Sequence, residues 1–227
     1  MFLLYRPPKG LLAARKADQM NLVIIDYGSG NLRSASKALE RVKNPDSKVY
    51  VTKDPEIVAK ADYLILPGVG AFPDCKRGIT TLPGMIDAIR ENVLSKGRPF
   101  LGICVGMQLM ATVGYEHGKT EGFGWLPGEV KRIDTNLKIP HMGWNELTIK
   151  VPNHPVLKNV RQGAFFYFVH SFQMTLKEEK FVIATTEYGG PITAVVGINN
   201  IIGTQFHPEK SQKMGLAMLE NFLNWRP

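Results

Sequence analysis

Residues 100–108 read Phe-Leu-Gly-Ile-Cys-Val-Gly-Met-Gln, a short apolar strand that turns into a helix at Cys104. The cysteine lies between Gly102 and Gly106, and glycine lacks the Cβ atom that would clash where a strand turns sharply. Such a corner lifts the cysteine side chain into a cleft at the positive end of the following helix, which favours the thiolate. The stretch therefore predicts a strand–turn–helix unit that carries a nucleophilic cysteine.

The flanking sequence extends this unit into an α/β domain. Apolar runs predict strands at 21–26, 48–52, 62–66 and 99–103, and helical periodicity predicts helices at 31–43 and 82–96. Alternating strands and helices imply a parallel sheet that helices cover on both faces. Functional residues of such sheets gather at the carboxyl ends of the strands, where Asp26, Pro67 and Cys104 fall.

The pattern changes after Gly114, where strands predominate. Apolar alternation predicts them at 129–133, 145–151, 165–170, 181–186, 192–198 and 200–206, with a closing helix at 213–225. We therefore predict one α/β domain over residues 20–227, with a central, mostly parallel sheet flanked by helices and additional antiparallel strands in the C-terminal half. Residues 1–19 lie outside this pattern and are expected to be a disordered or non-native leader.

Composition excludes several classes of protein. The chain has 227 residues, of which 44% are apolar and 21% charged, as in soluble globular domains. No apolar run approaches the roughly 18 residues that cross a bilayer, so we predict no membrane association. The net charge is +8, but residues 1–19 contribute +3 of it and the remainder is scattered without an arginine-rich run. This distribution favours a solvated basic surface over a nucleic-acid site, with attraction to a phosphorylated substrate or an acidic partner as the alternative.

Cysteines and histidines limit the chemistry further. Cys75 and Cys104 are the only cysteines, so the chain has neither a disulfide framework nor a four-thiolate zinc site, which indicates a reducing, cytoplasmic compartment. The five histidines are dispersed and form no His-Glu-x-x-His pattern, so we predict no metal and no cofactor. Cys75 lacks flanking glycines and is interpreted as structural, as buried cysteines usually are.

A base for the cysteine is predicted at His207-Pro208-Glu209, after the last strand. Residues 207 and 209 of an extended chain point to the same side, so Glu209 can orient the imidazole of His207. Pro208 cannot donate to a strand ladder, which places the tripeptide where pairing ends. His170 is the rival base, but no carboxylate lies close to it in sequence, so it is expected near the site rather than in the triad.

The loop Pro67-Gly-Val-Gly-Ala-Phe72 follows an apolar strand. Its glycines let the backbone turn N–H groups inward, as an oxyanion requires, so the amides of Val69 and Val105 are the predicted oxyanion donors. A flip of the 67–70 backbone is the expected gate of activity. The loop 26–31 lacks both the full glycine spacing and the lysine of a P-loop, so it is predicted as a tight turn rather than a nucleotide site.

Together these motifs resemble the class I glutamine amidotransferases, which have a flavodoxin-like fold and share the cysteine elbow and the distant His-Pro-Glu. The resemblance covers Met20 to the C-terminus and includes Ile25–Asn31, Leu66–Phe72 and Tyr167–Ser171. The narrower strings Pro140-His-Met-Gly-Trp-Asn145 and Gln205-Phe-His-Pro-Glu-Lys-Ser211 resemble the glutaminase subunits of imidazole glycerol phosphate synthase, of histidine biosynthesis.

The resemblance implies hydrolysis of L-glutamine. Cys104 would attack the side-chain carboxamide, and His207, held by Glu209, would protonate the leaving ammonia before water releases glutamate from the thioester. The implied substrate contacts are Gly70, Gln108, Ser171 and Phe172. Ammonia would pass to a synthase subunit, a (βα)8 barrel that closes the imidazole ring and yields imidazole glycerol phosphate and aminoimidazole carboxamide ribotide.

Trp144 indicates a contact with that partner, because aromatic anchors dominate interface energies. Burial in the core is the alternative for a tryptophan. The resemblance implies that the synthase interface comprises His141, Met142, Trp144, Tyr167 and Lys210.

Three other functions stay open on the sequence. The nearest is the amidotransferase subunit of another synthase, such as anthranilate synthase. A stand-alone cysteine hydrolase of γ-glutamyl or peptide bonds would act without a partner. A flavodoxin-like binding module with a vestigial site would show no glutamine-dependent labelling of Cys104, and it ranks last because all three triad residues are present.

Overall fold

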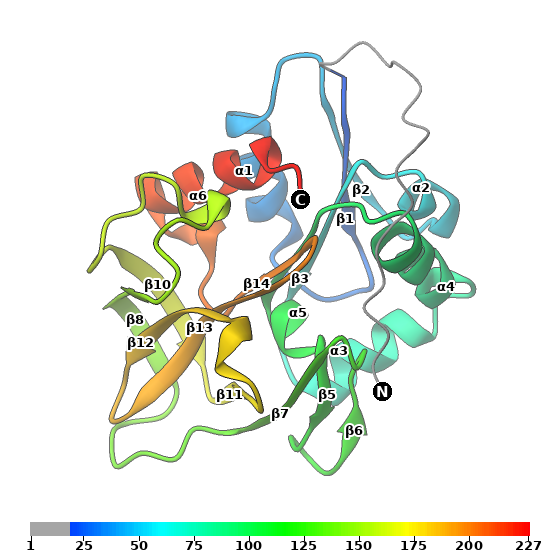
Figure 1. The fold of residues 1–227 in the computed structure, drawn as a ribbon. Coiled ribbons are helices and arrows are strands. Elements are labelled where there is room, and N and C mark those ends of the chain that lie inside the picture. Colours follow the sequence, from blue (N-terminus) through cyan, green and yellow to red (C-terminus); the bar gives the residue numbers. More distant parts are fainter. Residues whose placement is uncertain (1–18) are drawn as a thin grey trace.

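The computed structural model describes residues 19–227, so residues 1–18 of the predicted leader lie outside the described residues. A central sheet crosses the molecule between helices, and two smaller sheets lie at one end (Figure 1). This is the α/β arrangement that the alternation of strands and helices predicts.

The central sheet has eight strands in the order β2-β1-β3-β4-β14-β13-β12-β9. Their bounds are β1 (Asn21–Ile25), β2 (Lys48–Thr52), β3 (Tyr63–Gly68), β4 (Phe100–Cys104), β9 (Thr148–Ile149), β12 (Val182–Glu187), β13 (Pro191–Ile198) and β14 (Ile201–Thr204). The first five strands in this order run parallel, and the last three join antiparallel. Because β4 and β14 are parallel neighbours, with Ile103 opposite Thr204, their carboxyl ends meet at one edge of the sheet.

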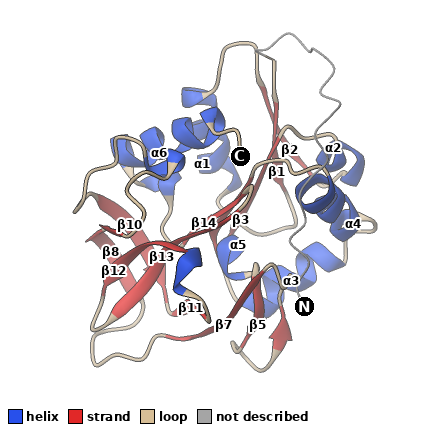
Figure 2. Ribbon diagram, in the orientation of Figure 1, coloured by secondary structure: helices blue, strands red, loops and turns tan. Residues whose placement is uncertain are grey.

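Helices cover both faces of this sheet (Figure 2). The bounds are α1 (Leu32–Val42), α2 (Pro55–Ala59), α3 (Phe72–Thr80), α4 (Met85–Arg90) with the π-helical turn η1 (Glu91–Ser95), α5 (Val105–Gln108) and α6 (Gln212–Asn224), and the short turns η2 (Pro155–Leu157), η3 (Glu179–Phe181) and η4 (Pro208–Lys210). α1 and α6 pack against each other on one face, and α2, α3 and α4 lie on the other. In α1 the buried residues Ala35, Ala38 and Leu39 follow the helical period, as an amphipathic helix requires.

Two smaller sheets contain most of the remaining strands. β8 (His141–Glu146) pairs antiparallel with β10 (Phe165–His170), and β11 (Phe172–Leu176), β7 (Leu126–Arg132), β5 (Ala111–Gly114) and β6 (Thr120–Glu121) form the other. The antiparallel strands predicted for the C-terminal half are therefore confirmed.

The prediction of one continuous strand at 145–151 is wrong, because two separate strands share this stretch. β8 ends at Glu146, and the next strand, β9, contains only Thr148 and Ile149. The exposed face of β8 is apolar, with Met142 and Trp144 pointing outward, so the alternation of polar and apolar residues that marks a half-buried strand is missing there.

Helix α3 was not predicted, and its sequence explains why. Pro73 and Gly78 interrupt the helical pattern of Phe72–Thr80. Proline is nevertheless compatible with the first turn of a helix, where its missing N–H has no partner to lose. Tertiary packing also stabilises this helix, since Phe72, Cys75 and Ile79 are all buried.

The core lies around the parallel strands. β3 and β4 are buried along their whole length, and β1 is buried from Leu22 onward, as expected for strands that helices cover on both faces. Each large apolar side chain buried in this way stabilises the fold by about 1.5–3 kcal/mol. Within residues 19–227, no helix combines the length and apolar character needed to cross a membrane.

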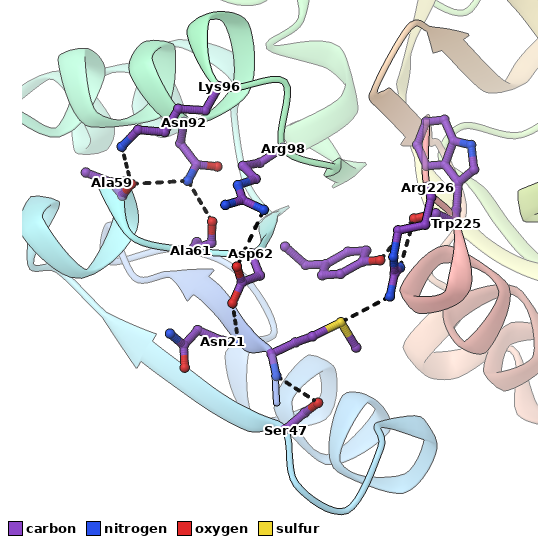
Figure 3. Close-up of polar contacts among 12 residues, drawn as sticks. Asn21, Ser47, Ala59, Ala61, Asp62, Asn92, Lys96, Arg98, Trp225 and Arg226 are labelled. Carbon is purple, nitrogen blue, oxygen red and sulfur yellow. Dashed lines mark hydrogen bonds and ion pairs between the residues drawn. The ribbon is translucent and has the colours of Figure 1, made fainter. Parts of the chain in front are cut away.

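Polar contacts hold together the amino ends of the parallel strands, opposite their carboxyl ends (Figure 3). The backbone N–H of Asn21 donates to Asp62 Oδ2 at 2.9 Å, and Asp62 Oδ1 lies 3.6 Å from a guanidinium nitrogen of Arg98. The buried side chain of Asn92, in η1, donates to the Ala61 carbonyl at 2.9 Å. These contacts tie the starts of β1, β3 and β4 together, away from the edge that holds Cys104.

Candidate active site

The cysteine elbow has a strained backbone that the flanking glycines permit. Cys104 has φ 55° and ψ −111°, a conformation that costs a residue with a side chain about 1–3 kcal/mol. A Cβ atom on Gly106 would lie 1.8 Å from the Leu66 carbonyl oxygen, and one on Gly102 would lie 2.6 Å from the Gly106 oxygen. These clashes confirm the predicted reason for the Gly-x-Cys-x-Gly spacing, although the helix that follows, α5, is only one turn.

Strand order brings His207 to the cysteine. Cys104 ends β4, and His207 follows β14 by three residues. Both residues line one cavity of about 380 Å³. The N–H of His207 donates to the Tyr167 carbonyl at 2.9 Å, which fixes the chain where it leaves β14. The structure thus places in one cavity two residues that are about a hundred positions apart in sequence.

Glu209 holds the imidazole of His207. Nδ1 of His207 lies 2.8 Å from Oε1 of Glu209, and the two side chains are 2% and 1% exposed. Burial lowers the pKa of His207, but hydrogen bonding and charge interactions with Cys104 and Glu209 raise it to a net value of about 9. Nε2 makes no hydrogen bond of ordinary geometry with the residues that the structure describes, although the thiol is near enough to raise the pKa. Nε2 is therefore available to the thiol or to a substrate atom.

His170, the rival base, lies on the cavity wall with both ring nitrogens engaged. The Phe172 carbonyl can only accept, so Nδ1 of His170 donates to it at 2.9 Å, and Nε2 accepts from Nδ1 of His141 at 2.9 Å. Burial lowers the pKa of His170 to about 3 and that of His141 to about 4, so both rings are neutral near pH 7. His170 lies beside the site, but its nitrogens are not free to act as a base.

The loop after β3 does not turn the predicted oxyanion donor into the cavity. The N–H of Val69 donates to Ser29 Oγ at 3.4 Å, and the Ser29 hydroxyl donates to the Val69 carbonyl. The Cys75 thiol donates to the same carbonyl at 3.5 Å. Val105, the other predicted donor, lines the cavity.

Buried neutral groups support this loop from behind. The Tyr27 hydroxyl donates to the Pro67 carbonyl at 2.8 Å. Burial raises the pKa of Tyr27 and that of Cys75, so both side chains keep their protons near neutral pH. Cys75 is therefore a donor that holds the loop, in keeping with its interpretation as structural.

The predicted substrate contacts, Gly70, Gln108, Ser171 and Phe172, all line the cavity. A further carboxylate on its wall, Glu116, was not predicted. One of its oxygens accepts from the Phe72 N–H at 2.8 Å. Glu116 lies in a polar turn before β6, and nothing in that local pattern distinguishes it from a solvated loop residue.

Gln205 was also absent from the predicted site residues. It is fully buried, and its Nε2 lies 3.7 Å from Sγ of Cys104. The Val169 carbonyl lies 4.0 Å from the same sulfur. Alternation in an extended chain puts residues 205 and 207 on one side, so the spacing of Gln205 from His207 was the available signal.

Four of the predicted interface residues share one surface with Phe165. Pairing of β8 with β10 puts Trp144 beside Tyr167, with ring centroids 6.0 Å apart, and Nζ of Lys210 lies 5.8 Å from the Tyr167 ring. Met142, Trp144 and Phe165 are 64%, 46% and 50% exposed, which excludes core burial of the tryptophan. We name Met142, Trp144, Phe165, Tyr167 and Lys210 the docking face.

His141 does not lie on this face, so its prediction as an interface contact is wrong. It is only 3% exposed, and its ring stacks on Phe168 at 4.8 Å and on Tyr188 at 4.1 Å. Successive side chains of a strand point to opposite faces of the sheet, so His141 faces the protein interior because Met142 faces solvent.

The geometry combines three groups of complementary chemistry. It supplies a thiol nucleophile, an imidazole whose raised pKa lets it give a proton, and a carboxylate that orients the ring. The cavity volume is within the range of small-molecule sites. Within residues 19–227 no three His, Cys, Asp or Glu side chains are grouped to hold a metal ion. This arrangement suits acyl transfer through a covalent thioester.

Comparisons with known proteins agree with this chemistry. The family described as glutamine amidotransferase class-I matches residues 23–225. The imidazole glycerol phosphate synthase subunits HisH of Rhodopseudomonas palustris and Rhodospirillum rubrum are 53% and 50% identical to this chain. Each of these comparisons covers 92% of this chain and 100% of the relative.

Solved structures share the fold at lower identity. PurLQS from Thermotoga maritima is 19% identical with a TM-score of 0.63, over 90% of this chain and 98% of that one. A structure of a glutamine amidotransferase is 20% identical with a TM-score of 0.64, over 88% and 98%. The match over nearly the whole chain and the identity to relatives of full length show that this chain belongs to the class I glutamine amidotransferases and, within them, to the HisH family of imidazole glycerol phosphate synthase subunits.

Proposed function

We propose that this chain is the glutaminase subunit of imidazole glycerol phosphate synthase and hydrolyses L-glutamine through a thioester on Cys104. The observation that carries the proposal is the shared cavity of Cys104 and His207, with Glu209 bonded to the imidazole. Sequence identity of about one half to HisH subunits supports this synthase over others of the class.

The reaction divides into two acyl transfers. The thiolate of Cys104 attacks the carboxamide carbon of glutamine, and the carbonyl electron pair moves to oxygen. When this intermediate collapses, the carbon–nitrogen bond breaks and His207 gives its proton to the leaving nitrogen, which releases ammonia. Water then attacks the thioester and gives a proton to His207, the carbon–sulfur bond breaks, and glutamate leaves. Glu209 keeps the imidazole oriented throughout.

The cavity wall offers contacts for the amino-acid end of the substrate. We assign this end to Gly70, Gln108, Ser171 and Phe172. The carboxylate of Glu116, on the same wall, offers the opposite charge to the ammonium group of glutamine. A variant that lacks this carboxylate should therefore raise KM more than it lowers kcat.

The oxyanion of each intermediate is assigned to the amides of Val69 and Val105. The Val69 N–H has to leave Ser29 before it can donate into the cavity, so the backbone of residues 67–70, from the end of β3 into the loop, must rearrange. Gly70, with φ 106°, permits backbone rotation that other residues resist. The isolated subunit is therefore expected to be slow until a partner and its ligand shift this loop.

The docking face is assigned to a cyclase subunit with a (βα)8 barrel, and the complex is assigned to the cytoplasm. The exposed side chains of Met142, Trp144 and Phe165 suit the apolar centre of a protein interface. Ammonia passes directly to the partner, which closes the imidazole ring and forms imidazole glycerol phosphate and aminoimidazole carboxamide ribotide.

The test is a glutaminase assay of the subunit alone and with the cyclase subunit and its ribonucleotide ligand. Glutamate release is expected to rise about tenfold or more in the complex, a coupling typical of linked sites, and to be absent in Cys104→Ala. Vigorous turnover of γ-glutamyl or peptide substrates without a partner would favour the stand-alone hydrolase. Co-purification with anthranilate synthase instead of the cyclase would favour the other synthase.

A further inference from the structure

A buried amide that does not line the cavity contacts the sulfur of Cys104. Gln205 is 0% exposed, and its Nε2 lies 3.7 Å from Sγ of Cys104. Gln205 is not among the described residues that line the cavity. Its backbone N–H donates to the Ala194 carbonyl at 2.8 Å, which ties it to β13.

The neighbouring groups determine which end of this amide faces the sulfur. The carbonyl of Phe172 can only accept, so the nitrogen of Gln108 faces it at 3.0 Å. The second N–H of that nitrogen donates to Oε1 of Gln205 at 3.0 Å. The oxygen of Gln205 is thereby engaged, and its nitrogen is left to point at Cys104.

The Phe172 carbonyl, at which this series of hydrogen bonds begins, is itself held in place. Phe172 also accepts from Nδ1 of His170 at 2.9 Å, so both lone pairs of its carbonyl oxygen have a donor. A carbonyl with two donors has little freedom to turn away from Gln108. The direction of the Gln205 amide is therefore fixed by a bonded series that ends at the thiol.

Besides His207, whose positive charge also favours the thiolate, two groups act on the sulfur in opposite senses. The Val169 carbonyl, at 4.0 Å, can accept from an S–H and so stabilises the neutral thiol. The N–H of Gln205 can donate to sulfur and stabilises the thiolate, which is the form that attacks glutamine. The Gln205 donor therefore adds to the effect of His207 and opposes that of the Val169 carbonyl.

We propose that Gln205 is a positioning residue for the nucleophile: its amide N–H, aimed by Gln108, holds Sγ of Cys104 and stabilises the thiolate. Gln205 does not line the cavity, and it acts through its two hydrogen-bond partners, the Cys104 sulfur and the Gln108 amide. The inference rests on the proposed glutaminase function only for its consequence on turnover, because the thiolate can be measured without glutamine.

The test compares the labelling of the two cysteines in one molecule. Wild type, Gln205→Leu and Gln205→Glu are treated with iodoacetamide from pH 6 to pH 10, and peptide mass spectrometry reports Cys104 and Cys75 separately. Leucine removes the donor at similar size, and glutamate places an acceptor oxygen where the donor was. Cys75, which bonds to Ser29 and Val69 rather than to Gln205, is the internal control.

The expected result is specific to Cys104. Its labelling at pH 7 falls about tenfold in Gln205→Leu, the loss of one hydrogen bond to a charged group, and further in Gln205→Glu. Its pH profile moves to higher pH and reaches the wild-type rate at the alkaline end, while Cys75 is unchanged. A structural role would instead change both cysteines, or change the rate at every pH. Either of these results, or Cys104 labelling within about twofold of wild type across the range, would overturn the proposal.

A second measurement uses the unsubstituted side chain and does not depend on the variants folding. In protein labelled with 15N-glutamine, the side-chain amide signal of Gln205 is expected to shift with pH in wild type and to lose that shift in Cys104→Ala. An amide signal that ignores Cys104 would also overturn the proposal. Because neither measurement uses glutamine turnover, failure of the glutaminase assay in wild type would count against the proposed function and leave this inference standing.

Discussion

The two walls of the cavity differ in how completely they are arranged for catalysis. At the ends of β4 and β14, Cys104, Gln205 and His207 are at most 3% exposed and are held by hydrogen bonds or charge interactions. On the loop after β3, Val69 is 40% exposed and its N–H is bonded to Ser29. The structure thus holds Cys104 and His207 in place, and we call this side of the cavity the prepared wall. The loop with Val69, whose N–H is still bonded to Ser29, is the unprepared wall. Donors aimed at developing charge often supply the largest part of catalysis.

The physical cause of this difference is the position of each wall in the fold. β4 and β14 are inner strands of the central sheet, so packing on both faces restricts the residues at their ends. Val69 and Gly70, which follow β3, are exposed to solvent, and such segments open at low cost in free energy. The fold thus places Cys104 and His207 at buried strand ends and Val69, the proposed oxyanion donor, in an exposed loop.

The largest effect is expected at the prepared wall. Cys104→Ala should reduce glutamate release by about 10⁴-fold or more, because it removes the atom that forms the thioester. Cys75→Ala is the matched control and should retain turnover, since that thiol only supports the loop. Equal losses in the two variants, measured at saturating glutamine in the complex, would show that the walls are not distinct.

Glu209→Gln tests how the carboxylate on the prepared wall raises the pKa of His207, the proposed proton donor. Its carboxylate contributes to the raised pKa of His207, so the variant lowers that pKa from about 9. Above its pKa the imidazole has no proton to give to ammonia. The alkaline limb of activity should therefore move to lower pH, and kcat should fall by about 10²-fold or more.

The control for this variant is Glu220→Gln on the exposed side of α6, which should leave the pH profile in place. An alkaline limb that stays where it is in Glu209→Gln would mean that another group controls proton transfer. The measurement is kcat against pH in the complex, with the fold verified by circular dichroism.

Trp144→Ala tests whether the docking face is separate from the prepared wall. Loss of an aromatic anchor should weaken binding of the cyclase subunit by about 1.4–2.8 kcal/mol, or about 10–100-fold in Kd. Iodoacetamide labelling of Cys104 in the free subunit should not change. Tyr115→Ala, an exposed aromatic residue outside the docking face, is the control for titration calorimetry. Equal affinities of Trp144→Ala and wild type would place the interface elsewhere.

The smallest expected effect is on the unprepared wall. Ser29→Ala removes the hydroxyl that binds both the N–H and the carbonyl of Val69. Without it the amide turns into the cavity at lower cost, so basal glutaminase activity without the cyclase should rise about two- to tenfold, the value of one or two neutral hydrogen bonds. Ser36→Ala on α1 is the matched control. A fall in basal activity would show that Ser29 supports the active arrangement instead.

Local signals were sufficient for the elbow and the His-Pro-Glu turn. The clash that requires Gly102 and Gly106 arises within one strand–turn–helix unit, so a five-residue pattern contains it. The same holds for β1, β3 and β4, whose unbroken apolar runs predict buried strands. The assignment of His141 to the interface failed because membership in a motif does not say to which side of a strand a residue points.

By itself, the sequence determined the class of the fold, and it predicted Cys104 as the nucleophile and His207 with Glu209 as its base, because these inferences depend on turns and periodicities among near neighbours. Only the tertiary structure decided that β4 and β14 lie side by side, that Gln205 meets the sulfur, and that Ser29 holds the Val69 amide. Such contacts join segments 40 to 101 positions apart. Their hydrogen-bond partners are selected by the packing of the whole sheet, which no local pattern records.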